Sequence, residues 1–394
     1  PLGPRQTGSI RIVPPKDVCA WKKGFDDIWM QHGVWGVDLD GQPRLLLPDY
    51  FSRREGKLVD FAQDYLRPFI NRFGKGIREV HPEATIFIEG EAEHTVSAFK
   101  WTDDDIDNIV YAPHWYDGLT LLLKRYFPFL GFDVHTLRPV VGAANIDNSF
   151  ARQMTTIRNY ARQYLNEAPT VIGETGIPFD LNNKTAYMTG NYHAQEQAMN
   201  RTMKALEASR VNFTLWNYTA DNSHEYGDLW NGEDLSIFSP DDRHNPADIN
   251  SGGRALKTVI RPYARASAGR PLRYSYDIET GCFEYVFRHD DDMTEPTDFY
   301  IPSYQYPQGY RVKISDGRYE MHPETQTLLY YHTERDIPHF IKVTPNPVRK
   351  TEKGTFETFW LPRLLSAGGI FLVLWVYLNR KNNHDEETIE NGDE

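Results

Sequence analysis

Cysteine is scarce in this sequence, since Cys19 and Cys282 are the only two among 394 residues. They lie far apart, and neither belongs to a Cys-X-X-Cys pair or a Cys/His cluster. Their spacing therefore suggests neither a disulfide framework nor a structural zinc site. We interpret both as ordinary reduced thiols, and the sequence suggests no metal and no organic cofactor.

Positive charge is also in deficit. The chain has 43 lysines and arginines against 55 acidic residues, a net charge of −12, which argues against nucleic acid as the main partner. No apolar run of signal-peptide length follows Pro1. Hydrophobic residues make up 40% of the chain, which is enough for a large core and one or two domains.

Short apolar runs alternate with amphipathic stretches over the first part of the chain. Parallel β/α units produce this alternation, because their strands are buried on both faces and read as continuous apolar runs. We predict strands at 84–88, 109–112, 170–172 and 212–215. We predict helices at 57–80 with a kink at Pro68, and at 148–165, 192–209 and 252–263. The predicted fold class is α/β, the C-terminal half of a (β/α)8 TIM barrel.

The pattern changes near Leu272, where short alternating strands are separated by Gly, Pro and Asp turns. This pattern is typical of a small all-β sandwich. We therefore place the partial barrel, strands five to eight, at 1–265 and the sandwich at 266–345. Residues 346–394 would form a linker, a hydrophobic helix at about 359–378 and an acidic tail.

Chemically useful side chains follow three of the predicted strands. Glu174 stands between Gly173 and Gly176 after one strand, His114 and Tyr116 follow another, and Trp216 follows a third. Taken singly, each has an ordinary structural explanation: a turn glutamate, a satisfied histidine, a core tryptophan. Their joint spacing favours a site at the carboxyl ends of parallel strands, where barrel enzymes place their catalytic residues.

The sequence motifs around these residues resemble those of glycoside hydrolase family 5. More narrowly, they resemble its fungal glucosylceramidase and steryl-β-glucosidase branch, which is close to the endoglycoceramidases. The resemblance runs from about Val13 to Val343. It is carried by His-Gly-Val-Trp-Gly at 32–36, Tyr-Ala-Pro-His-Trp-Tyr-Asp at 111–117, Ile-Gly-Glu-Thr-Gly-Ile-Pro at 172–178, Leu-Trp-Asn-Tyr at 215–218 and Gly-Asp-Leu-Trp-Asn-Gly-Glu at 227–233.

The resemblance implies a role for each residue. Glu174 matches the nucleophile that ends strand seven, and His114 and Tyr116 match the pair that ends strand six. Trp216 matches the platform that ends strand eight. The resemblance further implies contacts with substrate for Asn217, Trp115, Glu89, Glu91 and Trp35.

One part of the family pattern is missing. Retaining hydrolysis needs a second, acid/base carboxylate about 5 Å from the nucleophile. In the family, this carboxylate is the glutamate of an Asn-Glu-Pro motif at the end of strand four. No such motif occurs in these 394 residues. Asn166-Glu167-Ala168-Pro169 only resembles it, because it precedes strand seven at the opposite face of the barrel. We therefore expect the chain to be the C-terminal portion of a longer enzyme or a truncated gene product.

Three hypotheses follow. The first is a retaining β-glycosidase that cleaves glucosylceramide or steryl glucoside, present here as a fragment with little turnover of its own. The second is a catalytically inactive remnant that binds carbohydrate or a partner. The third is a tail-anchored membrane protein whose barrel is incidental. The sequence leaves the aglycone, ceramide or sterol, open.

The hydrophobic run at 364–378 suggests contact with a membrane. A spanning helix needs about 20 residues, and extension to Phe359 reaches that length but includes Pro362 and Arg363. A buried or dimerising helix is the alternative. Lysines and arginines are more numerous before the run than after it, so we expect the catalytic region in the cytoplasm. The glycosylation sequons at Asn212 and Asn217, on the predicted strand and directly after it, agree with this location.

Deletion of residues 359–381 tests the anchor. We expect the unmodified chain to stay with cell membranes during carbonate extraction, and the deletion variant to be released, because only the former has the apolar run. Deletion of the acidic residues 382–394 is the control and should change nothing. Release of all three proteins would contradict the anchor hypothesis.

Overall fold

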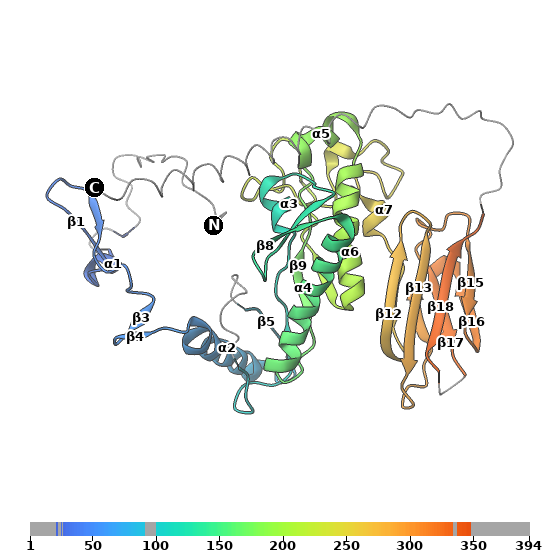
Figure 1. Ribbon diagram of the computed structural model, residues 1–394, viewed down its shortest axis with the longest axis horizontal. Coiled ribbons are helices and arrows are strands. Elements are labelled where there is room, and N and C mark those ends of the chain that lie inside the picture. The colour runs from blue at the N-terminus through green and yellow to red at the C-terminus, as the bar shows by residue number, and fades with distance from the viewer. Residues whose placement is uncertain (1–20, 23–24, 26, 91–99, 334–336, 348–394) are drawn as a thin grey trace, which may run out of the picture. The chain divides into compact units, whose positions relative to one another are not determined.

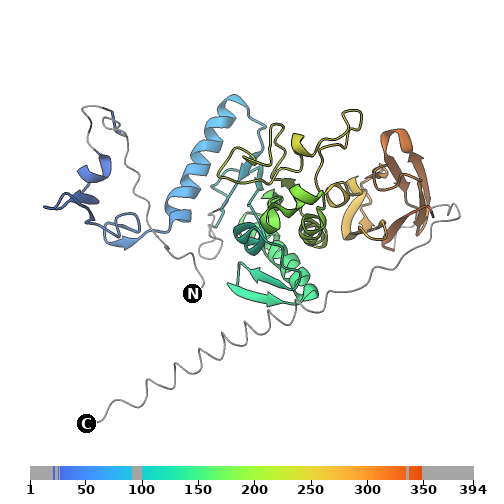
Figure 2. The same cartoon turned by 90° about the horizontal axis from the view of Figure 1, so that it is seen from above.

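The computed structural model describes residues 21–22, 25, 27–90, 100–333 and 337–347. Its helices and strands belong to one compact unit that ends at Asn346, and Figures 1 and 2 show them from two directions. Glu91, Cys19 and the hydrophobic run at 364–378 lie outside the described residues. No helix within these described ranges is both long and apolar enough to cross a membrane.

Short elements form the N-terminal segment. Asp38 supports the turn between β1 and β2, because its carboxylate accepts hydrogen bonds from the backbone N–H groups of Asp40 and Gln42. Each pair, β1 with β2 and β3 with β4, is antiparallel. The elements are α1 (Ile28–Gln31), β1 (Trp35–Val37), β2 (Pro43–Leu45), β3 (Arg53–Arg54) and β4 (Lys57–Leu58).

Four parallel strands follow in the described part of the chain, at the places that the sequence predicted. They are β5 (Ile86–Ile88), β6 (Ile109–Tyr111), β9 (Val171–Thr175) and β10 (Asn212–Leu215). β5 pairs with β6 and β9 pairs with β10. Isolated parallel bridges, Tyr111 to Thr170 and His114 to Glu174, join β6 to β9. The order β5-β6-β9-β10 confirms the prediction of successive parallel β/α units.

Helices alternate with these strands, as predicted. They are α2 (Arg67–Val80), α3 (Gly118–Leu123), α4 (Ala143–Tyr164), α5 (Leu181–Thr189), α6 (His193–Ser209) and α7 (Leu256–Val259). A π-helical turn at Ala62–Leu66 precedes α2, and the antiparallel hairpin of β7 (Leu130–Asp133) and β8 (Arg138–Val141) precedes α4. Figure 1 shows α4 and α6 next to each other. Their inward residues, Phe150, Met154, Met199 and Met203, are buried in one core with Ile172 of β9.

Two helix predictions are corrected by the structure. The helix predicted at 57–80 begins only at Phe61, and instead of a simple kink at Pro68 it has a π-helical stretch, Ala62–Leu66, that runs directly into α2. The helix expected at 252–263 is limited to α7, because Pro262 cannot continue a helix and β11 (Tyr263–Ala266) starts directly after it. The sandwich therefore begins before the predicted boundary at residue 266.

The C-terminal part is a two-sheet antiparallel sandwich, as predicted. One sheet has the order β11-β14-β17-β16 and the other the order β12-β13-β18-β15. Alternate residues of β13, β17 and β18 face a core that includes Phe283, Phe287, Phe299, Tyr330 and Val343. The remaining bounds are β12 (Gly269–Asp277), β13 (Cys282–His289), β14 (Thr297–Tyr300), β15 (Tyr310–Ile314), β16 (Arg318–His322), β17 (Thr327–Tyr331) and β18 (His339–Pro345), with 3-10 turns at Pro240–Asp242 and Pro323–Thr325.

A buried arginine links α6 to the sandwich. The Arg261 guanidinium is ion-paired with Glu207 of α6, donates to the Asn200 amide oxygen at 3.1 Å, and donates to the backbone carbonyl of Tyr276 on β12 at 2.9 Å. The Glu207 carboxylate also accepts the Tyr276 N–H at 3.2 Å. Because both charges are buried and hydrogen-bonded, the pair holds only while its partners stay in place.

Glu207→Gln should destabilise the fold. Removing one charge leaves the Arg261 guanidinium buried without its counter-ion, which typically costs about 3–5 kcal/mol. Chemical denaturation followed by circular dichroism measures the change. The matched control is Glu279→Gln, whose carboxylate pairs with Lys257 and is 66% exposed; we expect it to change stability by less than about 1 kcal/mol. Equal effects of the two variants would contradict the role of the buried pair.

Candidate active site

Glu174 is held by two side chains that follow the neighbouring strand. Its Oε1 accepts a hydrogen bond from the Tyr116 hydroxyl at 2.6 Å, and its Oε2 lies 3.5 Å from His114 Nδ1. The Glu174 side chain is 24% exposed. One carboxylate is thus fixed on two sides and still open to a ligand at the carboxyl end of β9.

Backbone pairing places these groups together. The chain after β6 continues beside β9, where the Gly173 N–H donates to the Pro113 carbonyl and the Trp115 N–H donates to the Glu174 carbonyl. Gly173 is required for this approach, because a Cβ atom there would lie 2.6 Å from the Ala112 carbonyl oxygen. Successive side chains of the segment alternate in direction, which brings His114 and Tyr116 to the same carboxylate.

Tyr116 is a neutral hydrogen-bond donor. Burial, followed by the hydrogen bond to Glu174 and the charge of that residue, raises the pKa of the Tyr116 hydroxyl far above its usual range. The phenol therefore keeps its proton and orients one lone pair of the carboxylate. The other oxygen of Glu174 faces His114.

His114 lies between two carboxylates. Its Nε2 is 3.4 Å from Glu89 Oε1, and its Nδ1 faces Glu174. Glu89 follows β5 directly and is half exposed. A neutral imidazole can donate a proton toward only one of these acids, whereas an imidazolium can donate to both. His114 can therefore hold or move a proton between the two groups.

The ends of β9 and β10 lie in close contact. The Trp216 N–H donates to the Thr175 carbonyl at 2.8 Å, and a Cβ atom at Gly176 would overlap the Trp216 carbonyl oxygen. The peptide bond between Trp216 and Asn217 is cis. Trp216 is partly exposed, and its backbone adjoins the residue that follows Glu174.

Asn217 belongs to a polar network beneath the loop after β10. Its amide donates to Asp228 at 3.2 Å, and its carbonyl oxygen accepts from Thr219 at 3.0 Å. Asn222 joins Asp228 to Asp234. These contacts occupy the Asn217 side chain with support of the loop, so the predicted contact with substrate is not the role that its hydrogen bonds favour.

Arg254 is the centre of that network, and sequence reasoning missed it. Its guanidinium is fully buried, donates to Asp234 and to the Ser236 carbonyl, each at 2.6 Å, and lies 4.5 Å from the centre of the Phe179 ring. Its partner Asp234 lies just after the recognised motif at 227–233, whereas Arg254 itself is 20 residues further along the chain, so the motif did not indicate the buried cation.

The remaining predicted residues do not join the Glu174 cluster. Trp115 is 3% exposed; its indole N–H donates to Gln153 and its ring packs on Phe150 of α4. It is a core residue, because its side chain points opposite to His114 and Tyr116. The Trp35 indole N–H donates to Asp27 in the N-terminal segment. Glu91 lies outside the described residues.

Glu167 lies at the opposite end of β9 from Glu174, as the sequence predicted. It is exposed and precedes β9, whereas Glu174 lies within the last residues of that strand. The two glutamates are thus at opposite ends of one strand. Within the described ranges, one group of three side chains is placed to share a metal ion, and it lies in the sandwich, away from these glutamates.

Parallel strands that end in a carboxylate, a tyrosine–histidine pair and a tryptophan are the arrangement that the sequence predicted for a glycoside hydrolase barrel, and the chain belongs to glycoside hydrolase family 5. The protein family described as Cellulase (glycosyl hydrolase family 5) matches residues 51–222. The model of the glycoside hydrolase family 5 C-terminal domain matches residues 261–344. The barrel strands and the sandwich are thus matched separately.

Individual relatives agree with the family. A glucosylceramidase of Rhizopus delemar is 31% identical over 366 residues, covering 86% of this chain and 53% of the relative. An ergosteryl-beta-glucosidase of Saccharomyces cerevisiae is 27% identical, covering 77% and 48%. The crystal structure of Cryptococcus neoformans sterylglucosidase 1 is 30% identical with a TM-score of 0.72, covering 81% of this chain and 50% of that one. The chain spans about half the length of these relatives.

Gly176→Ala should destabilise the site. The added methyl group would meet the Trp216 backbone, which cannot move without disturbing the contact between β9 and β10, and such overpacking typically costs about 1–3 kcal/mol. Denaturation monitored by circular dichroism measures the loss. Gly76→Ala is the control: this helical position of α2 has open space around a Cβ, so stability should stay the same or rise. A neutral Gly176→Ala would show that the strand ends are not closely packed.

Proposed function

We propose that this protein provides the nucleophile of a retaining β-glycosidase that cleaves the glucosyl bond of glucosylated lipids. The observation that carries the proposal is the Glu174 carboxylate, fixed by Tyr116 and His114 at the carboxyl end of β9. An ionised glutamate in this position can attack the anomeric carbon and form a glycosyl-enzyme intermediate, which water then hydrolyses.

The surrounding groups suit the stages of this reaction. The Tyr116 hydroxyl holds one Glu174 oxygen, so the other is oriented for attack. When the intermediate forms, the carboxylate loses its charge, and the Tyr116 phenol stays neutral and continues to donate. The Trp216 indole offers the apolar face on which a pyranose ring can stack. These roles need no cofactor.

A lipid aglycone fits the surface next to the site. The loop after β10 exposes Tyr218, Tyr226, Leu229 and Trp230, each about 60% or more accessible. Glu233, at the end of this loop, lies close enough to Tyr116 for its charge to raise the pKa of the hydroxyl. The loop is therefore near the site and apolar. The names of the relatives, a glucosylceramidase and steryl glucosidases, support glucosylceramide or steryl glucoside as substrate.

The alternative is a catalytically inactive protein that binds carbohydrate or a partner. It is favoured by the absence of an Asn-Glu-Pro word from the 394 residues, since protonation of the leaving group typically contributes about 10²–10⁴-fold to rate. Glu89 is the acid nearest to this role among the described residues, because His114 connects it with Glu174. The coding sequence upstream of Pro1 is the first place to search for the family glutamate.

Glu174→Gln separates the two functions. In a protein that carries the complete barrel, we expect this variant to lose nearly all hydrolysis of glucosylceramide and steryl glucoside, because an amide cannot form the glycosyl ester. Binding of the glucosylated lipid to vesicles should persist. Glu167→Gln, at the other end of β9, is the matched control and should retain full activity.

The first-formed sugar gives an independent readout of the same variant series. Retention predicts that the glucose released by the unmodified enzyme appears as the β-anomer in NMR spectra before mutarotation. Release of the α-anomer, or substantial turnover by Glu174→Gln, would overturn the assignment of the nucleophile. Lipid binding without turnover by the unmodified complete barrel would favour the alternative.

A further inference from the structure

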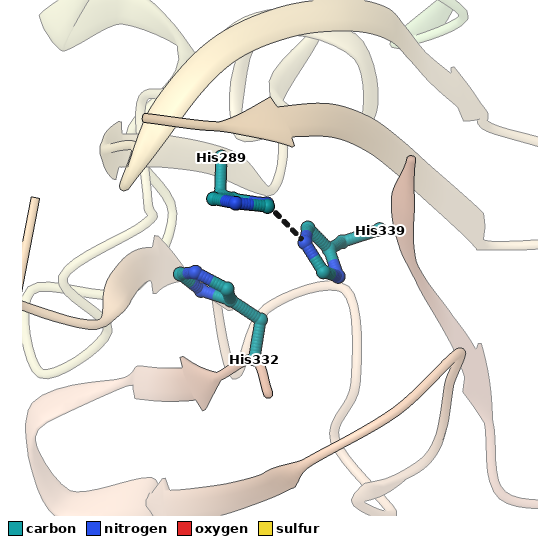
Figure 3. Close-up of side chains that lie close together, drawn as sticks. All are labelled: His289, His332 and His339. Atoms are coloured by element: carbon teal, nitrogen blue, oxygen red, sulfur yellow. Dashed lines mark hydrogen bonds between the residues drawn. The ribbon is translucent and has the colours of Figure 1, made fainter. Parts of the chain in front are cut away.

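Three histidines from separate strands of the sandwich converge at one point (Figure 3). His289 ends β13, His339 begins β18, and His332 follows β17. The ring centre of His332 lies 4.6 Å from the ring centre of His339 and 5.1 Å from that of His289. One nitrogen from each ring can be chosen so that the three atoms all lie within 4.8 Å of one another.

The cluster lies between the two sheets and is sheltered from solvent. β13 and β18 belong to one sheet, whereas β17 belongs to the other. His339 is completely buried, and the His289 side chain is 7% exposed. Phe287 and Tyr330 pack against the rings from the core side. Imidazoles enclosed in this way need partners for their ring nitrogens.

Two carboxylates flank the cluster and form a chain of contacts with it. Asp291 Oδ1 lies 3.2 Å from His289 Nε2, His289 Nδ1 lies 2.9 Å from His339 Nε2, and Asp316 Oδ1 lies 2.8 Å from His339 Nδ1. Each of these contacts requires one hydrogen. Two neutral imidazoles carry only two hydrogens, so one contact in the chain lacks a proton.

A metal ion resolves this shortage. If both rings donate their N–H groups to the carboxylates, the bare nitrogens His289 Nδ1 and His339 Nε2 face each other, which is favourable only with a cation between them. A histidine ligand whose other nitrogen donates to a carboxylate is the usual arrangement around protein-bound zinc. Tetrahedral zinc places two nitrogen ligands about 3.4 Å apart, so the observed separation of 2.9 Å must open only slightly.

His332 supplies the third ligand. Its ring centre lies 4.6 Å from that of His339, and one of its nitrogens lies within 4.8 Å of a nitrogen of each of the other two rings. Three imidazoles with one position left for water are a known zinc ligand set.

We propose that His289, His332 and His339 bind a divalent transition-metal ion of the zinc class, with Asp291 and Asp316 orienting two of the rings. The ion connects the sheets, because its ligands come from β13 and β18 on one side and from the end of β17 on the other. Residues 289, 332 and 339 lack the short spacing of zinc motifs, so no sequence motif points to this site.

A proton is the competing occupant. An imidazolium at His289 or His339 would also complete the three contacts, and it would need no third ring. The presence of His332 within ligand distance favours the metal. The two occupants differ in what they predict for added metal, which makes the proposal testable on the full chain without any measurement of glycosidase activity.

Titration of Co²⁺ into the metal-free chain is the direct test. We expect one equivalent to bind and to produce the visible absorption of a four-coordinate Co²⁺ ion with nitrogen ligands. Zn²⁺ should displace it, and saturating Zn²⁺ should raise the thermal unfolding midpoint by several degrees, because the ion binds the folded state preferentially. Absence of binding by the unmodified chain would overturn the proposal in favour of the proton.

Two histidine variants locate the site. His332→Ala should weaken Co²⁺ binding at least about 10-fold and abolish the Zn²⁺-dependent rise of the unfolding midpoint; its midpoint in EDTA should match that of the unmodified chain if the fold is intact. His322→Ala is the matched control. This exposed imidazole of the same sandwich lies near Glu320 and Glu324, where a surface ion could also bind. Loss of binding in His322→Ala, with His332→Ala unaffected, would identify a surface site and contradict the proposal.

Discussion

The geometry of the candidate active site depends on one stretch of parallel backbone pairing, between the segment after β6 and the end of β9. Two hydrogen bonds, from Gly173 to Pro113 and from Trp115 to Glu174, fix the register of these segments. The register decides which side chains reach the carboxylate, and the glycine permits the approach because a Cβ atom would collide with Ala112. Tyr116 and His114 then meet Glu174 without any further loop having to close over them.

Two buried arginines hold the surroundings in place. Arg254 gathers the aspartates beneath the loop after β10, and Arg261 joins α6 to the first strands of the sandwich. Each guanidinium makes both ionic and backbone hydrogen bonds, which a lysine could not do with the same planar fork. Both belong to structural support, and neither contacts Glu174. The rim of the barrel and its C-terminal domain are thus stabilised by the same kind of interaction.

The sequence was informative where a pattern is local. Continuous apolar runs predicted the four parallel strands of the described part of the chain, and the residues at their ends or just after them include Glu174, Tyr116 and His114, which the structure brings together. The sequence did not show which way each side chain of a short segment points. Trp115 was predicted to contact substrate like its neighbours, yet it faces α4. Arg254 and the three histidines were missed because their partners are distant in sequence. The helix predicted at 252–263 is shorter than expected because the prediction relied on apolar spacing, whereas Pro262 does not allow a helix to continue.

The alternation of His114, Trp115 and Tyr116 has a consequence for how genes of this type can vary. Trp115 faces the core whereas His114 and Tyr116 face Glu174, so a substitution on one face leaves the side chains of the other face where they are. A change in length is different, since the loss or gain of a single codon in this segment would turn the indole toward Glu174 and push a polar ring into the apolar core. Insertions and deletions should therefore accumulate in the surface loops and be purged from this stretch, whatever substrate a descendant enzyme adopts.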